Sequence, residues 1–312
     1  MFSLNATLPV FLVIVLGWFL MQKKMFNENF VDIINKFVFK VSLPVLLFKD
    51  IATTPIRDAF DPKFVIFCMI GTTIMFMGIW ALTSIFMKDK SMVGAFTQAS
   101  ARGSAAVLGI AFVQNIYGNS GMTPLMIVSA VPLYNIYSVI ILTFCANNQD
   151  HSDKAATIKR AFKNILTNPI ILGIAAGVPF SLLNIELPPL VLKTVTNVAQ
   201  TATPMALLAV GAGFEGRKAI KKLKPTMIAT FIKLVALPAI YFPFAIAMGF
   251  RESALVAILI MVGSPTTVTC YIMAKNMGND GVLSSSIIVM ATLLSSVTLT
   301  FWIFLLRSMG LI

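Results

Sequence analysis

Two apolar stretches of the chain carry small and polar residues at their middle, where a membrane-spanning helix would ordinarily continue unbroken. One runs from residue 98 to 109 (QASARGSAAVLG) and the other from 261 to 269 (MVGSPTTVT). Proline cannot donate a backbone hydrogen bond and clashes with the preceding turn, so the second stretch favours an interrupted helix. Hydroxyl groups could satisfy the freed backbone or contact a ligand, although small residues also serve simple helix packing. The candidate binding residues in these stretches are Gly103, Ser104, Ser264, Pro265, Thr266 and Thr267.

Arg102 lies inside the first of these stretches and carries a permanent charge. A cation near the bilayer centre costs about 2.5–3.5 kcal/mol on insertion scales, so its side chain should face a cavity or a partner. The twelve Asp and Glu residues all lie at the ends of apolar stretches or between them, so none is placed to neutralise it. Because a guanidinium is a planar fork that suits a carboxylate or phosphate, we expect an anionic ligand with Arg102 as its counter-ion. The alternative is that Arg102 binds backbone carbonyls at the break.

Other polar side chains also fall within apolar stretches. Asn135 places an amide at depth, where it is expected either to approach the interrupted segments or to bond a neighbouring helix. Lys40 lies one turn before Pro44 and is a candidate for the path of an anion. Lysines near the ends of spans usually extend to the membrane surface, and we expect this of Lys36, Lys193 and Lys233.

These residues must be positioned by a very apolar chain. Of its 312 residues, 58% are hydrophobic and 12% are charged, whereas soluble domains have about 25% charged residues. A helix of about 17–25 apolar residues spans a bilayer. The chain holds ten such stretches, at 3–21, 30–49, 64–87, 92–116, 122–147, 168–185, 189–213, 226–249, 254–274 and 282–306. We therefore predict an all-α integral membrane protein with ten transmembrane helices.

The net charge of +12 is concentrated in alternate connections between the stretches. Fourteen Lys and Arg residues lie in one set of loops and five in the opposite set. Because basic loops remain in the cytosol, this distribution predicts that both termini face outside, and it accounts for the charge without a nucleic-acid partner. The three cysteines lie inside apolar stretches without metal-ligand spacing, so we expect neither a metal nor another cofactor.

The two halves of the chain align at a constant offset of 160 residues, mostly at glycine and proline. Each half holds five stretches, so the second must enter the membrane in the opposite orientation. The predicted units are a first repeat at 1–147, a cytoplasmic linker at 148–164 and an inverted second repeat at 165–312. Inverted repeats place a substrate site where broken helices meet at the midplane, which fits stretches four and nine. The paired positions are Pro9 with Pro169, Gly17 with Gly177, Pro44 with Pro204, Gly103-Ser104 with Gly263-Ser264, Gly118-Asn119 with Gly278-Asn279, and Gly121 with Gly281.

These features favour a carrier and exclude several other classes. An intramembrane hydrolase needs a nucleophile and a base in one cavity, but the only histidine, His151, lies in the polar linker. We therefore do not expect an enzyme. A sodium/proton antiporter would be expected to place carboxylates at the breaks, and the sequence has none there. An anion channel, or an ion-coupled symporter, remains an alternative to a carrier of small organic anions.

Several motifs resemble those of the auxin efflux carrier family, in order and along the full chain. They are the segment from Asn35 to Phe48 around Pro44, Arg102-Gly103-Ser104 followed by Gly109, Tyr134-Asn135, and Gly263-Ser264-Pro265 leading to Gly278-Asn279-Asp280. The short linker resembles the bacterial branch, which contains carriers named as malonate and malate permeases. The chain departs from the family at Ser104, where Asn is common, and at Ala105, where a proline would match Pro265.

The resemblance implies an elevator-type carrier in a bacterial inner membrane. Spans 1, 2, 6 and 7 would form a scaffold, and spans 3–5 and 8–10 a transport unit with crossed, broken spans four and nine. The expected substrate is a small carboxylate such as malate or malonate, or an auxin-like acid. The expected partners are membrane lipid and a second copy of the chain, which would form a homodimer through scaffold helices 2 and 7. The alternative symporter would be of the related sodium/bile-acid type.

Overall fold

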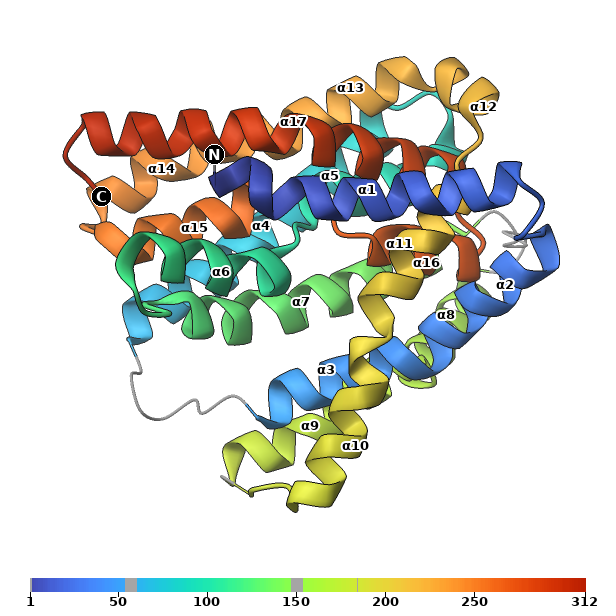
Figure 1. The fold of residues 1–312 in the computed structure, drawn as a ribbon, viewed down its shortest axis with the longest axis horizontal. Coiled ribbons are helices and arrows are strands. Elements are labelled where there is room, and N and C mark those ends of the chain that lie inside the picture. Colours follow the sequence, from blue (N-terminus) through green and yellow to red (C-terminus); the bar gives the residue numbers. More distant parts are fainter. Residues whose placement is uncertain (1, 54–60, 147–153, 184) are drawn as a thin grey trace.

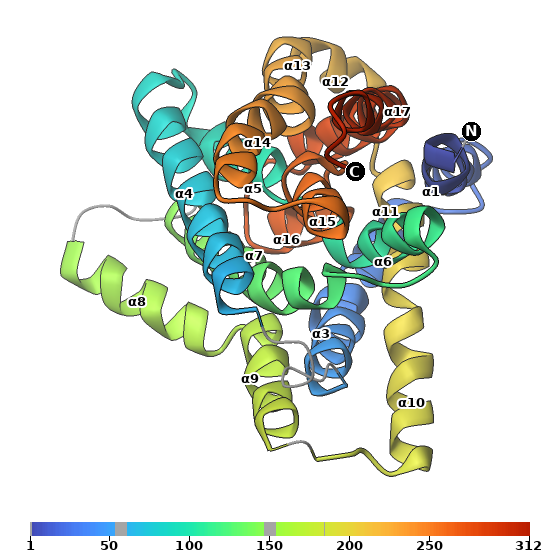
Figure 2. The same cartoon turned by 90° about the vertical axis from the view of Figure 1, so that its left-hand side faces the viewer.

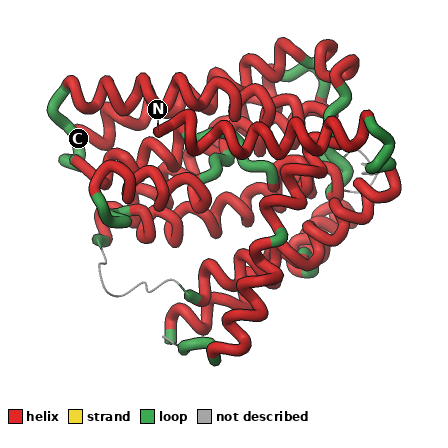
Figure 3. The backbone as a smooth tube through the Cα atoms, viewed as in Figure 1, coloured by secondary structure: helices red, strands yellow, loops and turns green. Residues whose placement is uncertain are grey.

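The computed structural model describes residues 2–53, 61–146, 154–183 and 185–312. In these residues all regular structure is helical, and short loops join the helices (Figure 3). The first half contains α1 (Phe2–Gln22), α2 (Glu28–Phe37), the π-helical turn η1 (Val38–Ser42), α3 (Leu43–Ala52), α4 (Pro62–Phe86), the 3-10 turn η2 (Lys90–Met92), α5 (Val93–Ala101), α6 (Ala105–Tyr117) and α7 (Thr123–Phe144). The second half contains α8 (Lys154–Leu166), α9 (Pro169–Leu182), α10 (Pro189–Gln200), α11 (Ala202–Ala212), α12 (Gly216–Lys221), α13 (Leu223–Phe231), the π-helical turn η3 (Ile232–Ala236), α14 (Leu237–Ala247), α15 (Glu252–Gly263), α16 (Thr269–Asn276) and α17 (Gly281–Ser308).

Each of the ten predicted stretches coincides with one helix or with consecutive helical segments. Within the described residues, four continuous helices are long and apolar enough to cross a membrane: Pro62–Phe86, Thr123–Phe144, Leu223–Ala247 and Gly281–Ser308. Several of the other stretches are divided into shorter helices, as at the α5–α6 and α15–α16 connections. The chain is thus an all-helical protein with the character of a membrane protein, and ten crossings stay a prediction.

Stretches four and nine are each divided into two helices, as their small residues and Pro265 predict. Residues 102–104 separate α5 from α6, and residues 264–268 separate α15 from α16. The missing proline at Ala105 therefore does not prevent the first break. The predicted linker contains α8 from Lys154 onward, whereas its earlier part, with His151, lies outside the described residues.

The repeat is visible in contacts between helices that are distant in sequence. Gly17 on α1 packs so closely on α11 that an added Cβ would lie 2.3 Å from the Leu208 carbonyl oxygen. Gly177 on α9 packs in the same way on α3, where the Cβ would lie 2.9 Å from the Phe48 carbonyl oxygen. Residues 17 and 48 lie 160 positions before 177 and 208, so the two contacts are equivalent. The shared glycines thus mark the same close approach in both halves.

Buried apolar side chains form two cores. One core joins α4–α7 with α13–α15 and α17, and the other joins α1–α3, α9, α11 and α16, with a few side chains from α7 and α17. Helices α3, α9 and α10 extend away from the rest of the bundle (Figures 1 and 2). Because α16 belongs to the second core and α15 to the first, the break between them lies at the boundary of the two cores.

The connections that carry most basic residues lie at one end of the molecule. Helix α12 and the α1–α2 connection are at this end, whereas the C-terminus and the α14–α15 connection are at the opposite end (Figure 1). The helices therefore run mainly between a basic end and a less basic end. Which end faces the cytosol stays a prediction from the charge distribution.

The close contact at Gly17 predicts the effect of a single methyl group. Gly17→Ala should lower stability by about 1–3 kcal/mol, because the added carbon meets backbone that cannot move aside as a side chain can. The measurement is the thermal unfolding midpoint of the purified protein in detergent. Gly78→Ala on α4 is the matched control, since nothing lies within 4 Å of an added Cβ there. Equal midpoints for the two variants would contradict the predicted packing of α1 on α11.

Candidate functional site

The two broken helices meet at their breaks and satisfy each other's backbone. The amide of Ser104 donates to the Pro265 carbonyl oxygen at 2.9 Å. Gly103 and Thr266 form an antiparallel bridge. The Thr266 hydroxyl donates to the Ala99 carbonyl oxygen at 2.7 Å. Backbone freed by a break must find such partners when it is away from water, so each break stabilises the other.

Two residues explain why the segments can come so close. Pro265 lacks the amide that would continue α15. Gly103 has no side chain, and a Cβ there would lie 2.4 Å from the Ser264 hydroxyl oxygen. That hydroxyl is buried and has no hydrogen-bond partner among the described residues. The first break therefore rests on close approach at Gly103 rather than on a proline.

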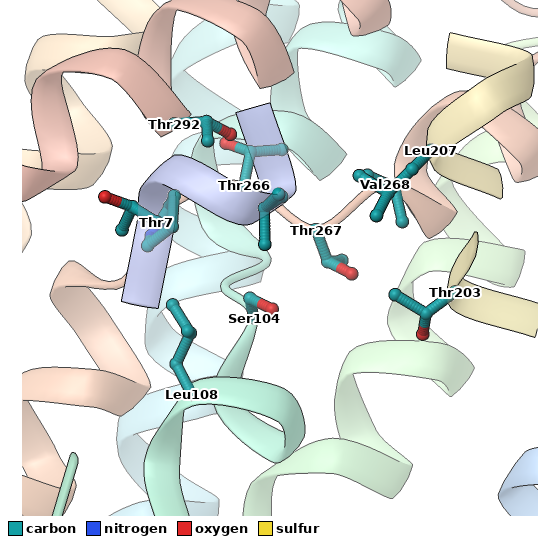
Figure 4. Close-up of a pocket in the computed structure, with 11 residues that line it drawn as sticks. Thr7, Ser104, Leu108, Thr203, Leu207, Thr266, Thr267, Val268 and Thr292 are labelled. Carbon is teal, nitrogen blue, oxygen red and sulfur yellow. The ribbon is translucent and has the colours of Figure 1, made fainter. Parts of the chain in front are cut away.

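A cavity lies beside the breaks, and six of its eleven lining residues are serine or threonine, among apolar side chains (Figure 4). Ser104 and Leu108 reach it from the start of α6, and Thr7 and Thr203 reach it from α1 and α11. The space open to the centres of water molecules is about 40 Å³, enough for a small number of waters. Because helices of both apolar cores contribute to its lining, the cavity lies between the two cores. Its complete lining is Thr7, Val10, Ser104, Leu108, Thr203, Leu207, Pro265, Thr266, Thr267, Val268 and Thr292.

Helix ends give this cavity a positive character. The 13-residue helix α6 begins directly after Ser104, and the eight-residue helix α16 begins directly after Val268. Both flanking residues line the cavity. The amino end of a helix carries a partial positive charge, although the Cys270 and Tyr271 amides of α16 already bond the Thr267 and Val268 carbonyls. The cavity thus combines hydroxyl donors with two helix amino ends, an arrangement suited to an anionic group.

Arg102 lies behind the breaks and is not part of the cavity lining. Its side chain is 5% exposed. One terminal nitrogen donates to the Asn135 side-chain oxygen at 2.8 Å, and the other to the Met273 sulfur at 2.9 Å. The predicted approach of Asn135 to the breaks is therefore observed. Both contacts are with side chains, and among the described residues no backbone carbonyl of the kind considered as an alternative accepts from the guanidinium.

The sulfur contact leaves Arg102 with a weak partner. Met273 also accepts a contact from the Gln98 amide at 3.3 Å, although thioether sulfur is a poor hydrogen-bond acceptor. No carboxylate forms an ion pair with Arg102 among the described residues. The charge is thus held by neutral groups, and a carboxylate would be a stronger partner.

The prediction that Lys233 extends to the membrane surface is wrong. Its side chain is fully buried, and its ammonium group donates to the Ala101 carbonyl oxygen at 2.9 Å and to the Met261 carbonyl oxygen at 3.3 Å. The apolar stretch was expected to begin at residue 226, whereas α13 begins at Leu223. Ten residues of helix rise about 15 Å, which places Lys233 near the middle. If the helix had been predicted to start earlier, within the basic segment, Lys233 would have been placed at its true depth.

The predicted site residues therefore separate into two faces of the crossing. Arg102 and Asn135 lie together on one face, whereas the cavity receives Ser104, Pro265, Thr266 and Thr267. Gly103 and Ser264 press against each other at the crossing itself. Lys40 has an exposed side chain on η1 and is not among the cavity residues, as is also true of Lys36 and Lys193. Lys233 was assigned to the membrane surface from the sequence, and the cavity residues Thr7, Thr203 and Thr292 were not among the predicted site residues.

Comparison with known proteins places this architecture among transporters. Residues 2–303 match the family model described as "Membrane transport protein". A protein of Rhizobium meliloti (strain 1021) named "Putative malonate transporter" is 25% identical over 96% of this chain and 95% of that protein. The "Uncharacterized transporter YfdV" of Escherichia coli (strain K12) is 22% identical over 98% of each chain. An "Uncharacterized transporter" of Methanothermobacter thermautotrophicus is 22% identical over 96% of this chain and 97% of its own length.

The bond across the breaks predicts different roles for two adjacent threonines. Thr266→Val should lower stability by about 1–3 kcal/mol, because it leaves the buried Ala99 carbonyl without its donor. Thr267→Val should have little effect, since Thr267 lines the cavity and, within the described part of the chain, its hydroxyl accepts only from Thr269, at 3.3 Å. Thermal unfolding in detergent measures both variants. If Thr266→Val were no less stable than Thr267→Val, the bond between the breaks would not be a structural tie.

Proposed function

Because this chain belongs to the membrane transport protein family, the auxin efflux carriers that its sequence resembles, we propose that it is a secondary transporter of small organic anions. It is a multi-pass membrane transporter and not an enzyme. The observation that carries the choice of substrate is the presence of two buried cations, Arg102 and Lys233, at the crossing of its broken helices. Neither forms an ion pair with a carboxylate among the described residues.

The uncompensated charge favours an anion over a cation or a neutral solute. Removing a cation from water costs several kcal/mol unless an opposite charge or well-placed dipoles offset it. Here carbonyls, an amide and a sulfur offset that cost only in part. An entering anion would complete the neutralisation. It would therefore gain binding energy that a neutral molecule of the same shape would not.

We place the carboxylate of the substrate in the hydroxyl-lined cavity. The amino ends of α6 and α16 and the hydroxyls of Ser104 and Thr267 would contact it there. Arg102 would attract it from the opposite face of the crossing, or bind it directly if α16 moves and withdraws Met273. A dicarboxylate such as malonate or malate is a reasonable first ligand, since one relative carries the name of a malonate transporter. An auxin-like monocarboxylate is the next to test.

Transport would require α4–α7 and α13–α17 to move relative to α1–α3 and α9–α11, which separates α16 from the scaffold side chains it packs against. The cavity lies between these two groups of helices, and α16 is tied to α2 by the Lys275–Asp32 ion pair at 3.5 Å and by an Asn276–Asn35 hydrogen bond at 3.2 Å. Breaking the exposed ion pair costs about 0–1 kcal/mol, so this pair can hold one side closed and still open readily. We propose an elevator-type movement of the α4–α7 and α13–α17 unit against a scaffold of α1–α3 and α9–α11.

The scaffold would also form the contact between two copies of the chain in a bacterial inner membrane. Leu190 and Val191 on α10 and Ile33 and Val41 on α2 and η1 are exposed, and they fit either lipid or a partner scaffold. With both termini outside, the basic loops would face the cytosol. An inside-negative potential would then favour anion export by about 2.3 kcal/mol per charge per 100 mV, whereas uptake would need a solute or ion gradient.

Counterflow in proteoliposomes tests the proposal. Vesicles preloaded with unlabelled malonate, malate or indole acetate should accumulate the labelled acid, because a carrier exchanges substrate across the membrane. Arg102→Ala should reduce accumulation at least tenfold, which corresponds to about 1.4 kcal/mol. Arg307→Ala is the matched control, since Arg307 is exposed at the end of α17.

Two results would favour the alternatives. Current under an anion gradient without counterflow would indicate an anion channel. Counterflow only in the presence of sodium would favour a symporter of the sodium/bile-acid type. Equal loss in Arg102→Ala and Arg307→Ala would remove Arg102 from the binding mechanism.

A further inference from the structure

We propose that the ammonium group of Lys233 is a built-in cation that joins the carboxyl ends of the two broken helices, in a place where a free metal cation would otherwise be needed. Carriers with discontinuous helices commonly hold a coupling ion with the carbonyls of half-helix ends. Here those carbonyls are already bound to a side chain of the same protein. The consequence for transport rests on the proposed function, whereas the structural role of Lys233 does not.

The contacts of Lys233 bridge both breaks. Ala101 is the last residue of α5, and Met261 lies two residues before the end of α15. Carbonyls at the last turn of a helix lack intrahelical donors and carry partial negative charge. The ammonium group donates to both, at 2.9 Å and 3.3 Å. One cation thus faces the partial negative charges of two helix carboxyl ends at once.

The surroundings of the ammonium group resemble a cation site made of oxygen ligands. A Cβ at Gly103 would lie 2.9 Å from the Lys233 nitrogen and 2.4 Å from the Ser264 hydroxyl oxygen, so both groups lie against the same glycine. The Ser264 hydroxyl is buried without a partner among the described residues. The Met261 carbonyl also accepts from the Tyr134 hydroxyl at 2.8 Å. Two carbonyls and a free hydroxyl are ligands that a hard cation such as sodium uses.

The helix that carries Lys233 is distorted at this residue. Ile232–Ala236 form the π-helical turn η3, with Lys233 as its second residue. Such turns within α-helices are frequent at functional sites. The Trp302 ring nitrogen donates to the Leu234 carbonyl oxygen at 2.9 Å, which satisfies backbone within the turn. The repeat-equivalent position in the first half is Thr73, so a single lysine serves both halves.

Thermal unfolding in different salts tests the structural role. The wild-type midpoint should be the same in sodium, methylammonium and choline chloride, because Lys233 already occupies the site. Lys233→Ala should unfold at a lower temperature in choline chloride, and sodium or methylammonium should restore at least half of the loss. Lys233→Met should be destabilised without rescue, because its side chain fills the space. Lys193→Ala, at an exposed lysine on α10, is the control.

Two results would overturn the built-in cation. One is a Lys233→Ala variant as stable as wild type in choline chloride, and the other is a loss of stability that neither sodium nor methylammonium changes. In proteoliposomes, wild-type malonate counterflow should be equal in sodium and choline, whereas Lys233→Ala should lose at least tenfold in choline and recover in sodium. A wild-type requirement for sodium would also overturn it. Absence of wild-type counterflow in every salt would reject the proposed function instead, and the unfolding experiment would still decide the role of Lys233.

Discussion

The structure depends on one constraint: backbone groups freed inside an apolar bundle must find partners within the protein. Two helices are broken in this chain, and neither break could be stable alone. The Ser104–Pro265 backbone bond, the Thr266–Ala99 bond and the Lys233 bridge each connect one broken helix with the other. Each broken helix is therefore stabilised by the other, and the crossing brings four helix ends to one point.

This arrangement determines how charge is distributed around the crossing. The carboxyl ends of α5 and α15 meet the ammonium group of Lys233, whereas the amino ends of α6 and α16 face a cavity lined by hydroxyls. Arg102 adds a second charge on the far face, held by an amide and a sulfur. The carboxyl ends of the broken helices thus face a cation on one side of the crossing, and their amino ends, which attract anions, face the other side. Binding an anion is the chemistry that this separation favours.

The sequence predicted the local causes of this structure better than its long-range contacts. The 160-residue offset and Pro265 located both breaks, and the depth of Asn135 suggested its approach to them, but its hydrogen bond with Arg102 was not predicted. The close contacts of Gly17 and Gly177 explain why glycine recurs in both halves. Thr7 and Thr203 could not be identified, because they join the site only through the packing of α1 and α11 beside the breaks. Lys233 was misplaced because the start of its helix could not be read from a segment rich in lysine.

The central claim is that positive charge at the crossing lacks an internal counter-ion, and Asn135→Asp tests it most directly. The substitution preserves shape and places a carboxylate about where the Asn135 oxygen lies, 2.8 Å from Arg102. Malonate counterflow should fall at least tenfold while the unfolding midpoint stays equal or rises, because the protein then supplies its own anion. Asn135→Ala, which adds no charge, should retain more transport than Asn135→Asp. Wild-type counterflow in Asn135→Asp would contradict the account.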